Sequence, residues 1–153
     1  MESLQWEATL ARAQSAGKDL LDALLDNDAP KAKSALDKAH YPLAGPFHHA
    51  SEDNFAVCMR ALLFPDPRYA TLSETYMGLG RADLLCLPTP EGGKGLPAII
   101  FELKVGKSDD EALGQIEDRE YASSLKGYEG NILEVGIDYD PESKTHEVKI
   151  ARV

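Results

Sequence analysis

The sequence predicts an α/β domain: a mixed, mostly antiparallel five-stranded sheet, flanked by helices and preceded by a helical extension. Apolar residues recur at helical spacing in the first part of the chain, and from Tyr69 the period changes to that of strands. Glycine-rich or polar turns separate the strand-like stretches. The chain has 153 residues, of which 43% are apolar, enough for the core of one domain.

Three helices are expected before the sheet. The first covers residues 3–26, where leucines and alanines give a partly amphipathic pattern. The second follows Asp28, which can cap it, and has Pro30 in its first turn. We expect 41–49 to be irregular because prolines and a glycine interrupt it, and a third helix to start near Ser51.

The strands are recognised by their period of two and by their bounding turns. A further helix is expected at 108–125, where Ser108 and Glu111 form a capping box. It separates the third strand from the fourth, whose apolar residues alternate and so share one face. The expected strands cover residues 69–77, 81–88, 97–105, 132–139 and 147–153.

Composition limits the function. The net charge of −10 repels phosphate backbones, so any nucleic-acid hypothesis needs an explanation such as metal-binding carboxylates or a basic partner. No apolar run approaches the roughly 20 residues that span a bilayer, and no signal peptide is recognised. Cys58 and Cys86 lack metal-type spacing, which favours reduced, buried thiols in a cytoplasmic protein without membrane association.

Three charged residues interrupt otherwise apolar strands. Glu102 and Lys104 are two residues apart and therefore share a face, whereas Phe101 and Leu103 point the other way. If the second and third strands form a hairpin, Asp83 comes opposite the Glu102–Lys104 region, although the sequence leaves the register open. This hairpin would collect an acid, a second acid and a lysine at one place on the sheet.

Two readings of this cluster follow from its chemistry. Carboxylate oxygens suit Mg²⁺ or Mn²⁺, and an ion held by Asp83 and Glu102 could activate a water and polarise a phosphoryl group. Lys104 could then orient the water or stabilise charge on the phosphate. In the other reading, Lys104 pairs with Glu102 or Asp83 at the sheet margin and no chemistry follows.

The wider context of these residues is informative. The stretches GLGRADLL, AIIFELKV, EALGQIEDREYA and ILEVGIDYD resemble the PD-(D/E)XK nuclease superfamily. Within it, the chain is similar to a nuclease-like domain of poorly characterised function that often follows ATPase-like regions. The resemblance implies a restriction-endonuclease-like core over residues 47–153 after a helical lead-in over residues 1–46. It also implies an ATPase-like domain or partner.

The resemblance assigns metal and catalytic roles to particular residues. Asp83 and Glu102 would bind Mg²⁺ or Mn²⁺, and the backbone carbonyl of Leu103 would contribute to the same ion. Lys104 would be the catalytic lysine. Glu52, on the third helix, matches an acid that completes the metal shell.

The expected helix at 108–125 carries two further candidates. The resemblance makes Gln115 part of the catalytic set, contacting the substrate phosphate or the lysine. Arg119, one turn later, could bind a phosphate or could pair with a neighbouring acid of its own helix. His48 or His49 could join Glu52 at a metal, but histidines at a helix entry more commonly face solvent.

The function implied is a metal-dependent nuclease that hydrolyses phosphodiester bonds of DNA or RNA, with DNA favoured over RNA. The alternative is a catalytically inactive module with the nuclease fold, which regulates or binds proteins or nucleic acids in a larger assembly. The charge of −10 motivates this alternative, because a basic stripe for a phosphate backbone is missing.

Overall fold

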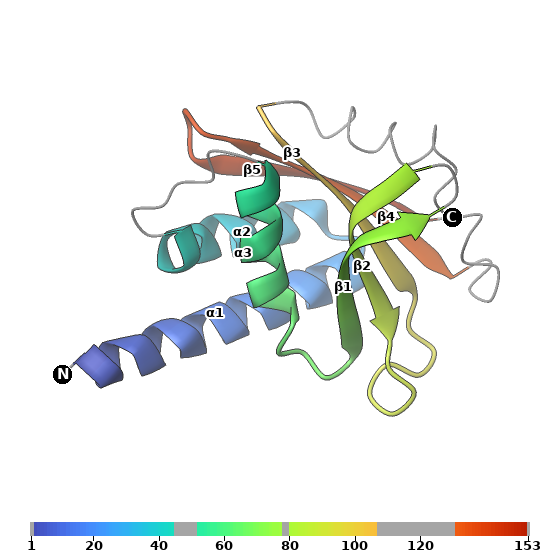
Figure 1. Ribbon diagram of the computed structural model, residues 1–153, viewed down its shortest axis with the longest axis horizontal. Coiled ribbons are helices and arrows are strands. Elements are labelled where there is room, and N and C mark those ends of the chain that lie inside the picture. The colour runs from blue at the N-terminus through green and yellow to red at the C-terminus, as the bar shows by residue number, and fades with distance from the viewer. Residues whose placement is uncertain (1, 45–51, 78–79, 107–130, 153) are drawn as a thin grey trace.

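Five strands form one sheet, in the order in which they occur along the chain (Figure 1). The third and fourth strands run parallel, and the other neighbouring pairs are antiparallel. Together with the helices, this confirms the predicted α/β class with a mixed, mostly antiparallel five-stranded sheet.

The computed structural model describes residues 2–44, 52–77, 80–106 and 131–152. The helix expected at 108–125 lies outside the described residues. None of the described helices is both long enough and apolar enough to cross a membrane. The elements are α1 (Glu2–Leu25), α2 (Ala29–Ala44), α3 (Glu52–Leu63), β1 (Tyr69–Met77), β2 (Gly80–Pro88), β3 (Ala98–Val105), β4 (Ile132–Asp140) and β5 (Thr145–Arg152).

The second helix begins as predicted and ends later. The backbone N–H of Lys31 donates to Asp28 Oδ1 at 3.1 Å, so Asp28 caps the amino end of α2. The prediction that the chain is irregular from Tyr41 was wrong for its first residues, because α2 continues through Pro42 to Ala44. Pro42 stands in the final turn of the helix, where its missing N–H removes a single intrahelical bond.

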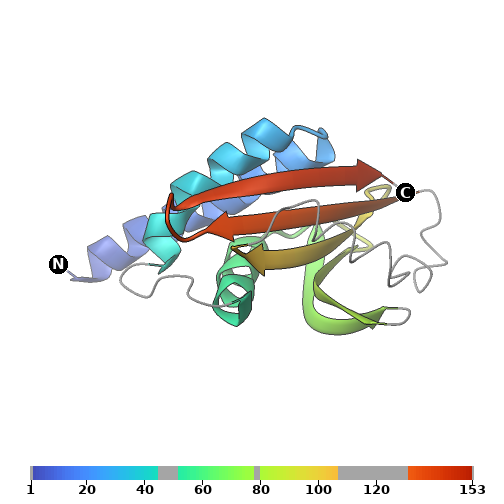
Figure 2. The ribbon, with the colours of Figure 1, turned by 90° about the horizontal axis from the view of Figure 1, so that it is seen from above.

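The described helices pack against one face of the sheet. Helix α2 lies along β5, α3 lies against β1 to β3, and α1 packs on the other two helices (Figures 1 and 2). Burial of these side chains away from water supplies the main stabilisation, roughly 25 cal/mol per Å² of apolar surface. The shared core includes Leu20, Leu24, Leu36, Phe55, Met59, Leu84, Phe101, Val135 and Ile137.

Alternation along β3 sorts its side chains between two faces. Ile99, Phe101 and Leu103 belong to the core beneath the helices. Their neighbours Glu102 and Lys104 therefore lie on the opposite face. Every residue of β3 except the last is buried, so both faces of this central strand are shielded from water.

Helix α1 of the lead-in is held against the rest of the chain by a close helix contact and by an ion pair. A Cβ added at Gly17 of α1 would collide with the backbone carbonyl of Leu62, so glycine allows α1 and α3 to approach closely. Arg68, just before β1, donates to Asp22 of α1 at 2.7 Å and to Asp66 at 2.8 Å. Helices and sheet thus share one core, and the proposed boundary at residue 46 remains a prediction.

Candidate active site

The clearest feature of the face away from the described helices is a buried ion pair on β3. Nζ of Lys104 lies 3.2 Å from Oε1 of Glu102. Glu102 is 1% exposed and Lys104 is 9% exposed. Burying two charges costs more desolvation energy than burying apolar groups, and the central strand bears this cost.

The pairing of β2 with β3 ends next to Asp83. The paired residues run from Cys86↔Ile99 to Leu84↔Phe101. Asp83 and Glu102 are the next residues along the two strands, beyond the last of these pairs. That Asp83 comes opposite Glu102 remains a prediction.

The structure describes the other predicted site residues to different extents. Leu103 points its side chain into the core, and its carbonyl belongs to the β3 backbone. Glu52 is the first residue of α3. The side chains of Asp83 and Glu52 lie outside the described part of the chain, as do Gln115 and Arg119 entirely.

Strand β4 adds charges that the sequence analysis did not use. Asp138 is the register partner of Lys104, and Glu134 is the partner of Ile100. Both acids are buried, on the same face as Glu102. The sequence signal for these acids is in ILEVGIDYD, where they occupy two of the positions between the apolar residues.

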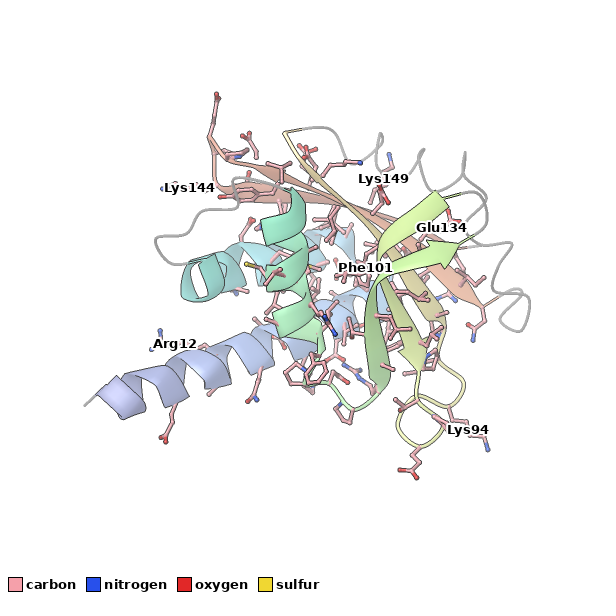
Figure 3. All side chains as sticks on the ribbon, in the orientation of Figure 1. Arg12, Lys94, Phe101, Glu134, Lys144 and Lys149 are labelled. Carbon is pink, nitrogen blue, oxygen red and sulfur yellow. The ribbon has the colours of Figure 1, made fainter. Side chains whose placement is uncertain are left out.

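The charged face continues onto β5. Glu147 is the partner of Asp138, and Lys149 is the partner of Gly136, itself the partner of Glu102. Glu134 and Lys149, labelled in Figure 3, thus come from adjacent strands of one face. The strand register thereby aligns rows of charged residues across the sheet.

An acidic groove adjoins the Lys104 end of this face. Its volume is about 490 Å³, and Asp138 is one of its walls. Among the described side chains, no group of three histidines, cysteines or acids is arranged to hold a metal ion. The predicted ligands Asp83 and Glu52 were not among those side chains. The groove is lined by Gly106, Asp138, Asp140, Pro141, Glu142, Thr145 and Glu147.

The fold and the Glu–x–Lys strand define a nuclease-type α/β domain. The sequence matches the profile of the PD-(D/E)XK nuclease superfamily over residues 50–149, which is more than half of the chain. The chain belongs to this superfamily, as the sequence motifs predicted. A search of curated proteins finds no match. The matched region contains α3, all of β1 to β4 and most of β5.

The residues present fit a divalent metal. Mg²⁺ and Mn²⁺ prefer oxygen ligands, which the carboxylate of Glu102 and the carbonyl of Leu103 supply from one strand. Asp83 precedes Leu84, the last β2 residue that is paired with β3, and its part in a metal site stays a prediction. Glu52 would have to reach the same place from the start of α3, and its role stays a prediction.

Proposed function

We propose that the protein is a Mg²⁺- or Mn²⁺-dependent nuclease that hydrolyses phosphodiester bonds. The observation that carries the proposal is the buried Glu102–Lys104 pair on the face away from the described helices. Membership of the superfamily supports it, because PD-(D/E)XK nucleases generally use divalent metals such as Mg²⁺. DNA is the favoured substrate and RNA the alternative.

Each residue has a role in this proposal. Asp83, Glu102 and the Leu103 carbonyl hold the ion, with Glu52 as a further ligand. When bound, the ion polarises a phosphoryl oxygen and acidifies a water. Lys104 donates hydrogen bonds to the attacking water or to the developing charge on the phosphate.

Two proposed contacts come from the stretch outside the described residues. Gln115 contacts the substrate phosphate or the ammonium of Lys104. Arg119 binds a neighbouring phosphate, for which a guanidinium is well suited. A metal at the site, together with these groups, offsets the repulsion between a chain of net charge −10 and a polyanion.

Cleavage assays test the proposal. The purified protein should cut DNA in the presence of Mg²⁺ or Mn²⁺, and both Asp83→Ala and Lys104→Ala should abolish cutting. Lys94→Ala is the matched control, because Lys94 is an exposed lysine in the β2–β3 loop, apart from β4 and β5 (Figure 3). Equal activity in the wild type and both site variants would indicate a contaminating nuclease and overturn the proposal.

Metal binding provides a second readout that does not depend on cutting. Calorimetry should detect Mn²⁺ binding to the wild type, and Glu102→Ala should remove the signal. Removing one partner of a buried pair can cost about 3–5 kcal/mol, so circular dichroism must show that each variant is folded. Absence of Mn²⁺ binding at millimolar metal would favour the non-catalytic module, which the net charge of −10 also favours.

A further inference from the structure

We propose that Asp138 is a positioning residue that takes over the ammonium of Lys104 when Glu102 binds the metal. This inference rests on the proposed function and concerns the same site. It assigns a task to a buried acid on β4 that sequence reasoning did not select.

The first step concerns competition at Glu102. In the structure, Oε1 of Glu102 is 3.2 Å from the lysine ammonium. A divalent ion bound by the same carboxylate would place two further positive charges beside that ammonium. Like charges a few ångströms apart repel strongly where water is largely excluded. Metal binding therefore favours a shift of Lys104 away from Glu102.

The second step concerns where the ammonium can go. Lys104 is 9% exposed, so it cannot simply turn into bulk water. A buried charge that loses its partner costs several kcal/mol. A second carboxylate within reach would remove this penalty, and the flexible four-carbon stem of lysine permits the exchange.

The third step identifies the acceptor. Asp138 is the register partner of Lys104 on the parallel strand, and neighbouring strands lie about 4.8 Å apart. The two residues share a face and are equally shielded, each 9% exposed. Glu147 is one strand further away and exposed, while Glu134 is opposite Ile100. Asp138 is therefore the best-placed acid on β4 and β5.

The test compares two variants that each remove one charge from the same groove. In Asp138→Asn, Lys104 stays on Glu102 and competes with the metal, so the calorimetric affinity for Mn²⁺ should fall on the order of tenfold. The kcat for DNA cleavage should fall while KM changes little. Glu147→Gln, the control, should change the affinity less than twofold, and Asp138→Glu should restore part of it.

A crystal structure with Mn²⁺ and a check that the variant is folded complete the test. In crystals soaked with Mn²⁺, Nζ of Lys104 should lie within hydrogen-bond distance of an Asp138 oxygen. Wild-type affinity in a folded Asp138→Asn variant, or an unchanged Lys104–Glu102 pair in the Mn²⁺ crystal, would overturn the inference and leave the proposed function intact. Failure of the wild type to bind Mn²⁺ would overturn both.

Discussion

The two faces of the sheet are built from alternate residues of the same strands, yet they differ in kind. Beneath the helices, β3 and β4 contribute apolar side chains such as Phe101 and Val135 to one core. On the other face, Glu102, Lys104 and Asp138 are shielded almost as completely. In this molecule, buried side chains are therefore not always apolar. Buried charged groups are costly and cluster at functional sites, so the face that holds them is the candidate active site.

The helix-covered face also contains a polar contact, at its margin. The surroundings of this contact differ from those of the charged pair on the other face. His146 of β5 is 1% exposed and packs its ring against Phe55 and Tyr139, with centroids 5.5 and 5.0 Å away. Its Nδ1 lies 2.8 Å from Asp37 of α2, which also accepts the His146 backbone N–H at 2.9 Å. These bonds hold helix α2 against the edge strand β5, so their role is structural.

The largest effect on stability is expected on the apolar face. Phe101→Ala should lower the free energy of unfolding by about 3–5 kcal/mol, because it removes a fully buried ring and leaves a cavity. Urea unfolding followed by circular dichroism measures the change. Val57→Ala on α3, where the side chain is 68% exposed, is the control and should stay within about 0.5 kcal/mol. Similar losses in both variants would contradict this view of the core.

Much of the fold was predictable because its signals are local. The change from helical period to period two placed the helices and strands, and Asp28 marked the start of α2. The parallel pairing of β3 with β4 depends on contacts between distant segments, which periodicity does not encode. For that reason the sequence could suggest that Asp83 approaches Glu102 but could not bring Asp138 beside Lys104.

A smaller effect is expected at the polar contact of the helix-covered face. Burial raises the pKa of the Asp37 carboxyl, but hydrogen bonds from Lys33 and His146 outweigh this and hold the pKa below its ordinary value. A lowered pKa stabilises the fold above the unfolded-state value of 3.8, and this stability is lost as pH falls through the folded-state pKa. Asp37→Asn should therefore be less stable at pH 7 by about 0.5–1 kcal/mol.

The pH dependence distinguishes this electrostatic effect from a general loss of packing. In thermal unfolding between pH 7 and 3, the gap between wild type and Asp37→Asn should shrink as pH drops below about 4. Asp19→Asn, an exposed site on α1, should track the wild type throughout. A gap of constant size would show that the carboxylate charge contributes nothing.

A similarly small change in stability is expected where the charges are most deeply buried, provided that both charges are removed together. Replacing both partners in Glu102→Gln/Lys104→Met should alter the free energy of unfolding by about 1 kcal/mol or less, because the desolvation cost of the pair disappears together with its attraction. Mn²⁺ binding and cleavage should vanish in the same variant. Urea unfolding and calorimetry on one preparation measure both. A large loss of stability would instead show that the pair has a structural role, as the hydrogen bonds of Asp37 do. It would also remove the reason for regarding the charged face as an active site.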